Sequence, residues 1–131
     1  MWAEIKQAIA DTLAAELGGG VSVTAVADAE IPTVDAVRVL RAATSGRPVY
    51  GRPVGVQQLD VEMWVTDDDP AAADARLDEL EEQVTRALER IPRDSFILKV
   101  EITGIDPDGD LFRPTVGSRM GLRVNWRQRR D

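Results

Sequence analysis

Apolar and polar residues alternate most regularly near the middle of the chain, and this alternation predicts one long strand that begins near Val54. Every second side chain is apolar, which is the period of a strand with one buried face. The polar side chains between them belong to the opposite face. The apolar positions are Leu59, Val61, Met63 and Val65, and the alternating positions are Gln58, Asp60, Glu62, Trp64 and Thr66.

A helix from Pro70 to Ile91 is predicted directly after this strand. Asp69 followed by Pro70 is typical of a helix start, because the carboxylate caps free N–H groups and proline suits the first helical position. Apolar residues then recur every three or four positions and form one stripe. Pro92 lacks an N–H and ends the helix. The stripe consists of Leu77, Leu80, Val84, Leu88 and Ile91.

The same periods predict a second helix and four further strands around this pair. Residues 2–17 form an amphipathic helix that three glycines, Gly18 to Gly20, terminate. Strands are expected at 21–26, 35–43, 97–105 and 118–128. Leu98, Val100 and Ile102 are expected on one face of the 97–105 strand. The expected core contains Leu59, Val61, Met63, Leu80, Val84, Leu88, Val100, Ile102, Leu122 and Val124.

This order of elements predicts an α+β fold, in which two helices pack on one face of an antiparallel or mixed β-sheet with long hairpin loops. If the strands on either side of the 70–91 helix are parallel, their connection is a right-handed crossover. The 131 residues fit one domain, 1–131, by the usual size of domains.

Composition removes several classes of function. The chain has no histidine and no cysteine, so Ser–His and Cys–His nucleophile pairs and thiolate metal sites are excluded. Its net charge of −7 argues against general nucleic-acid binding, which needs an excess of Lys and Arg. No apolar run approaches the roughly 20 residues that span a bilayer, and the first residues do not have the pattern of a signal peptide. We therefore expect no membrane partner.

Two connecting segments carry candidate contact residues. Residues 44–53 combine glycines and prolines with Arg47 and Arg52, which suits either a long hairpin loop or a loop that docks on a partner. The glycine spacing does not match a phosphate-binding loop, because Arg52-Pro53 replaces Lys-Ser/Thr. Residues 106–110 are typical of a tight turn and do not match a calcium loop. Residues 111–117 form a looser tip, where Phe112 either contacts a partner or seals the sheet.

The outward faces of two strands carry opposite charges. Asp60 and Glu62 lie on one strand, and Arg119, Arg123 and Arg127 lie on another. If the strands are neighbours, these groups can pair with each other, or with Glu101, across the sheet of one protomer. The alternative is that this charged face meets another subunit.

The pattern of the chain resembles the tail terminator proteins of long-tailed phages, the lambda-type minor tail protein U family, and the related tail completion proteins. The resemblance covers nearly the whole sequence. It is carried by the helix that ends in Gly18–Gly20, the strand 57–65, the helix that starts at Asp69-Pro70, the turn 106–110 and the closing strand 121–126.

The resemblance implies a virion protein that needs no cofactor and no catalyst. Its protomers form a homo-hexameric ring that caps the head-proximal end of the tail tube, ends tube polymerisation and joins the head–tail connector proteins. DNA then passes through the lumen without specific binding, and assembly takes place in the cytoplasm of the bacterial host. Candidate contacts to the tail tube or a neighbouring subunit are Arg47, Tyr50, Arg52, Phe112 and Arg113, and candidate subunit-interface residues are Asp60, Glu62, Arg119, Arg123 and Arg127.

Three other functions stay open at this stage. The first is a tail completion or head–tail connector protein, which the sequence does not separate from a terminator. The second is a small ligand-binding regulatory domain, which would need a convergent polar cluster. The third is an enzyme with paired carboxylates, although the acidic residues lie mostly on predicted helix surfaces.

Overall fold

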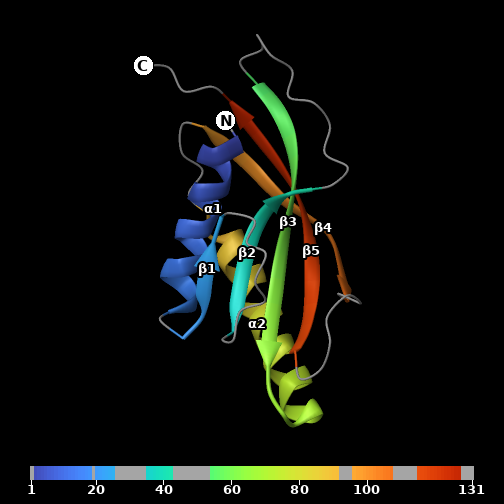
Figure 1. The fold of residues 1–131 in the computed structure, drawn as a ribbon. Coiled ribbons are helices and arrows are strands. Elements are labelled where there is room, and N and C mark those ends of the chain that lie inside the picture. The colour runs from blue at the N-terminus through green and yellow to red at the C-terminus, as the bar shows by residue number, and fades with distance from the viewer. Residues whose placement is uncertain are drawn as a thin grey trace.

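The computed structural model describes residues 2–18, 20–25, 35–42, 54–91, 96–107 and 115–127. These residues form two helices and one mixed five-stranded sheet, and both helices lie on the same side of the sheet (Figure 1). The fold is α+β, as the sequence predicts. In chain order the elements are α1 (Trp2–Leu17), β1 (Ser22–Thr24), β2 (Ala36–Arg41), β3 (Val54–Thr66), α2 (Pro70–Glu89), β4 (Ile97–Pro107) and β5 (Thr115–Arg127).

The strands lie side by side in the order β1-β2-β3-β5-β4. β1 runs parallel to β2, and every other neighbouring pair is antiparallel. Because β3 and β4 are each antiparallel to β5, they are parallel to one another, with β5 between them. α2 therefore connects two parallel strands and crosses over β5, and β4 is left as the outermost strand on that side of the sheet.

The core lies between the sheet and the two helices. α1 packs on β1 and β2, and α2 packs on β3 and β5. Each antiparallel pair places directly opposed residues on the same face, so Leu59 faces the helices together with Leu122. The buried rows that the periodicity predicts are confirmed for β3, β5 and both helices. They include Ile5, Ile9 and Leu13 of α1, Leu59, Val61, Met63 and Val65 of β3, Leu80, Val84 and Leu88 of α2, and Met120, Leu122 and Val124 of β5.

The start of α2 follows the capping pattern in the sequence. Asp69 has an extended backbone, with φ −88° and ψ 114°, and its carboxylate accepts a hydrogen bond from the backbone N–H of Ala71 at 3.1 Å. Pro70 occupies the first helical position, where its missing N–H has no cost. At the end of α1, Gly18 takes a left-handed φ of +76°, which glycine adopts without strain. Both predicted helix boundaries are thus confirmed.

The predicted burial of β4 is wrong in part. Ile102 was expected in the core, but its side chain is 37% exposed, and Leu98 is exposed as well. The register of β4 against β5 shifts between Ile97 and Lys99 and again between Ile102 and Gly104, which interrupts the strict alternation of faces. Ile102 still pairs with the buried Leu122 and faces the helix side, but β4 lies beyond the strands on which α2 packs.

The strands beside the predicted turn are longer than expected. Asp106 and Pro107 were assigned to the turn, but they pair with Arg119 and Ser118 as the last residues of β4. Proline is tolerated there because β4 is an edge strand. β5 likewise begins at Thr115 rather than Ser118. The centre of the predicted turn and tip, residues 108–114, lies outside the described residues.

Candidate interaction surface on the outer face of the sheet

The face of the sheet that points away from the helices carries the charged side chains that the sequence analysis singled out. The register places Glu62 of β3 directly opposite Arg38 of β2 on one side and Arg119 of β5 on the other. These three side chains come from strands far apart in the sequence. The outer face is therefore the candidate functional site, and it is a surface for contact rather than a pocket.

Glu62 connects three strands through its carboxylate. Arg38 Nη2 lies 3.2 Å from Glu62 Oε2, and Arg119 Nη2 lies 3.4 Å from Glu62 Oε1. Glu62 is only 8% exposed, so two cations compensate a carboxylate that is largely removed from water. The guanidinium of Arg38 also stacks over the indole of Trp64, 4.1 Å from the ring centroid.

Asp60 lies beside Glu62 on the same face and is less well compensated. Partial burial raises the pKa of the Asp60 carboxyl above its ordinary value, because burial disfavours the charged form. Arg119 acts in the opposite direction, and the negative charge of Glu62 raises the pKa of Asp60 further. The two carboxylates are thus compensated unequally, since Arg38 and Arg119 form their ion pairs with Glu62 and not with Asp60.

A second group of charges lies on β4 and β5. Lys99 Nζ lies 2.5 Å from Glu101 Oε1, and Arg123 Nη1 lies 3.7 Å from Glu101 Oε2. The hydrogen bond from Lys99 is the main cause that lowers the pKa of Glu101. Arg123 remains 48% exposed, and Arg119 remains 46% exposed.

The pairing within one protomer that the sequence allowed is therefore present for Glu62 with Arg119 and for Glu101 with Arg123. Both arginines still present large exposed surfaces, and Arg127 is exposed at the end of β5. Their proposed role in contacts between subunits stays a prediction. The other candidates, Arg47, Tyr50, Arg52, Phe112 and Arg113, lie outside the described residues.

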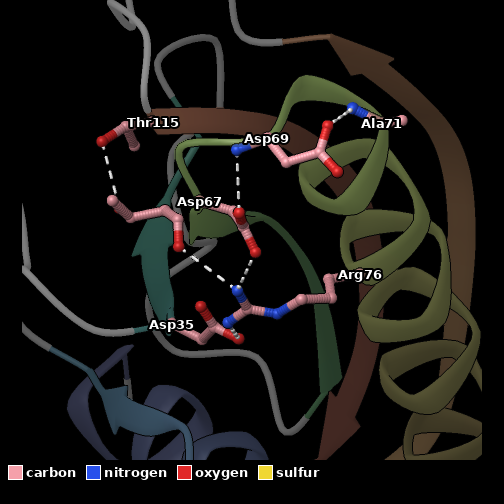
Figure 2. A network of polar contacts seen from close by, with 7 residues as sticks. Asp35, Asp67, Asp69, Ala71, Arg76 and Thr115 are labelled. Atoms are coloured by element: carbon pink, nitrogen blue, oxygen red, sulfur yellow. Dashed lines mark hydrogen bonds and ion pairs between the residues drawn. The ribbon is translucent and has the colours of Figure 1, made fainter.

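A separate polar network joins the end of β3 to the start of α2 (Figure 2). Arg76 of α2 donates to the backbone carbonyl of Thr66 at 3.2 Å and to the carboxylate of Asp67 at 3.1 Å, and it also pairs with Asp35. Asp67 in turn accepts from the backbone N–H of Asp69 at 2.9 Å, and this bond is the main cause that lowers the pKa of Asp67. The network holds the strand–helix junction against the residue before β2.

Sequence reasoning missed several of these partners. The sequence analysis assigns no role to Arg38, Arg76 or Lys99. The role of Arg38 depends on which strands are neighbours, and the sequence does not contain the strand order. Arg76 reaches Asp35 through the tertiary fold, and Lys99 pairs with Glu101 two residues further along β4. Arg76 carries one local signal, because it lies about two helical turns after the acidic helix start.

Among the described residues, no cluster of three or more acidic residues has the geometry to hold a metal ion. A hollow of about 160 Å³ lies between the last turn of α2 and the start of β4. Within the residues that the structure describes, neither helix is long and apolar enough to cross a membrane. The lining of the hollow is Leu88, Glu89, Ile91, Ile97, Lys99 and Val100.

Comparisons with known proteins find a similar fold and no match in sequence. The sequence matches no known protein family, and no curated protein matches it. The fold is similar to a chain in the virion of a native gene transfer agent particle, with a TM-score of 0.63 and 11% identity over 94% of both chains. A crystal structure from Akkermansia muciniphila matches 72% of this chain and 42% of its own, with a TM-score of 0.42 and 14% identity.

At 11% identity, the first of these comparisons establishes a shared fold. The match spans nearly the full length of both chains, so it covers the whole arrangement of helices and strands and not one common motif. The TM-score of the second comparison, 0.42, is too low to support any argument.

Proposed function

We propose that this chain is a structural virion protein of a phage-like particle, and that it forms a homo-hexameric ring at the head-proximal end of the tail tube. The ring ends tube polymerisation and presents the surface that head–tail connector proteins join. The observation that carries the proposal is the full-length fold similarity to a chain of the gene transfer agent virion. The sequence resemblance to phage tail terminators, which rests on different evidence, supports the same function.

The charges of the protomer suit assembly through unlike surfaces. A ring needs head-to-tail contacts, in which one surface of a protomer meets a different surface of the next. The outer face of the sheet exposes Arg119, Arg123 and Arg127, whereas the exposed side of α2 is rich in acids. Unlike surfaces of opposite charge favour this kind of contact and make it sensitive to salt.

The proposal includes no catalytic step. The chain lacks the histidine and cysteine of the commonest nucleophile pairs. Glu62 and Glu101 on the outer face form ion pairs with Arg38, Arg119, Lys99 and Arg123, which suits a contact surface. A net charge of −7 also suits a lumen that carries DNA, because like charges keep the DNA from adhering.

Growth of tail tubes in vitro tests the proposed function. The purified tail tube protein of the same particle is polymerised with and without this chain, and tube lengths are measured by negative-stain electron microscopy. We expect shorter tubes with extra density at one end only, at a ratio of a few copies per tube. Tubes of unchanged length with bare ends would contradict the proposal. Binding to isolated head connectors without binding to tubes would instead assign the chain to the completion proteins.

A further inference from the structure

The helix-side face of β4 is apolar, and its second half is exposed. Ile102 pairs with Leu122, and Ile105 pairs with Met120, so both isoleucines face the same side of the sheet as these core residues. Leu122 and Met120 are buried beneath α2, whereas Ile102 is 37% exposed and Ile105 is 44% exposed. We call Ile102 and Ile105 the apolar strip. It continues the core surface past the edge of the helix layer.

The flank of α2 that borders this side is acidic. Asp74, Glu81 and Leu88 are seven residues apart and follow one stripe along the helix, and Leu88 lines the hollow together with Val100 of β4. The opposite flank faces the rest of the fold, since Arg76 pairs with Asp35 and Arg90 pairs with Glu16. Asp74, Asp78 and Glu81, which we call the acidic flank, form no ion pair within the described part of the chain.

The apolar strip is not suited to simple strand addition. β4 is a long edge strand, and such edges pair readily with other chains unless something interrupts them. Here the two register shifts, at Ile97/Lys99 and at Ile102/Gly104, break the regular ladder. A partner is therefore expected to cover the side chains of the strip and not to extend the sheet along its full length.

A surface of matching character lies on the outer face of the same chain. Val56 is 51% exposed, the highest value among the large apolar side chains that the structure describes. It pairs with Asn125, so Arg123 and Arg127 flank it along β5, and Lys99 of β4 pairs with Asn125 from the other side. We call Val56, Lys99, Arg123 and Arg127 the basic patch. It combines an apolar centre with three cations, two of which, Lys99 and Arg123, share the carboxylate of Glu101.

We infer that the apolar strip and acidic flank of one protomer receive the basic patch of a second copy of this chain. In this contact the apolar strip packs on Val56, and the acidic flank faces the three cations of the basic patch. The two surfaces lie on opposite faces of the two-layer protomer. Such a contact is head-to-tail, so repetition builds a ring when the rotation between successive copies closes. The inference rests on the proposed ring and deepens it, because it names the two surfaces that meet.

Charge reversal on each surface tests the contact. One variant, Asp74→Lys with Glu81→Lys, makes the acceptor surface basic; the other, Arg123→Glu with Arg127→Glu, makes the donor surface acidic. In each variant alone, the two surfaces carry the same sign, so we expect loss of the oligomer in native mass spectrometry while circular dichroism stays unchanged. Mixed at equal amounts, the variants again offer opposite signs at every contact. We expect the mixture to regain a closed oligomer with alternating subunits.

The matched control is Glu79→Lys with Glu82→Lys, which makes the same charge change on the same helix but away from the flank. It should assemble like the wild type. A second probe is the variant Ile102→Asp with Ile105→Asp, which makes the apolar strip polar. It should abolish assembly, and mixing it with the Arg123→Glu/Arg127→Glu variant should not restore the oligomer.

The inference is overturned if either single-surface variant assembles like the wild type, or if the mixture stays monomeric. It is also overturned if the strip variants form normal rings but no longer bind tail tubes, because the strip would then belong to the tube contact. In these cases the proposed function survives, since the wild type still forms rings. A wild type that never forms a ring, alone or on tubes, would instead reject the proposed function and the contact with it.

Discussion

The side chain of Gln57 is polar and fully buried on the core face of β3. It pairs with Val124 and is 1% exposed, and within the described residues neither its amide nitrogen nor its amide oxygen has a hydrogen-bond partner. An unsatisfied buried polar group costs about 1–3 kcal/mol, and replacing it by an apolar group of similar shape relieves that cost. The fold therefore carries a local instability in β3.

We expect Gln57→Met to raise the free energy of unfolding by about 1–3 kcal/mol, because methionine fills a similar volume without polar atoms. Urea denaturation measures the change. Gln58→Met, on the outer face of the same strand, is the control and should shift stability by no more than about 0.5 kcal/mol. A loss of stability in Gln57→Met would mean that the amide has a role in the fold that its contacts do not reveal.

At the scale of elements, the apolar stripe of α2 is the main anchor of the helix layer. Leu80 and Val84 are buried between α2 and the sheet. We expect Leu80→Ala to lower the free energy of unfolding by about 2–5 kcal/mol, the range for a leucine truncated in a packed core. Ile102→Ala is the matched control on β4. Because Ile102 is already partly exposed, its truncation should cost clearly less, and equal losses at the two sites would contradict the burial described.

The junction of β3 and α2 makes a pH-dependent contribution. The pKa of Asp67 is lowered in the folded state, chiefly by the N–H of Asp69 and then by Arg76. A lowered carboxyl pKa stabilises the fold at pH values above the unfolded value, which is near 3.8, and this contribution is lost as the pH falls through the folded value.

We therefore expect Asp67→Asn to lower the thermal unfolding midpoint at pH 6, with the difference from the wild type shrinking below about pH 4. Scanning calorimetry across that range measures it. Asp68→Asn serves as the control, because Asp68 is exposed and no hydrogen bond from it appears in the described part of the chain. An Asp67→Asn deficit that persists unchanged at pH 3 would exclude the ionised carboxylate as its cause.

The elements, and the inward faces of β3, β5 and both helices, could be predicted from the sequence, because period and capping are local properties. The register shift at Ile97/Lys99, which moves Leu98 off the predicted face of β4, could not. The structure confirms the alternation around Val61, the stripe around Leu80 and the cap at Asp69. The exposure of Ile102 could not be predicted, since period gives the face of a residue but not whether a helix covers it. The carboxylate of Glu62 between Arg38 and Arg119 depends on the strand order, which is a property of the tertiary fold.

At the scale of the whole molecule, the protomer is polarised. The exposed side of α2 is acidic, and the outer face of β5 is basic. Two copies repel each other when surfaces of the same charge meet. They attract each other when the acidic side of one copy meets the basic face of the next, which is a head-to-tail contact.

The central claim is that the chain works as a closed ring. Native mass spectrometry of the purified protein, over a range of protein and salt concentrations, tests it most directly. The account predicts a discrete species at six times the chain mass of 14.4 kDa at low salt, which dissociates as salt screens the charged contacts. A monomer under every condition, with or without tail tubes, or a continuous ladder of oligomers without a closed species, would contradict it.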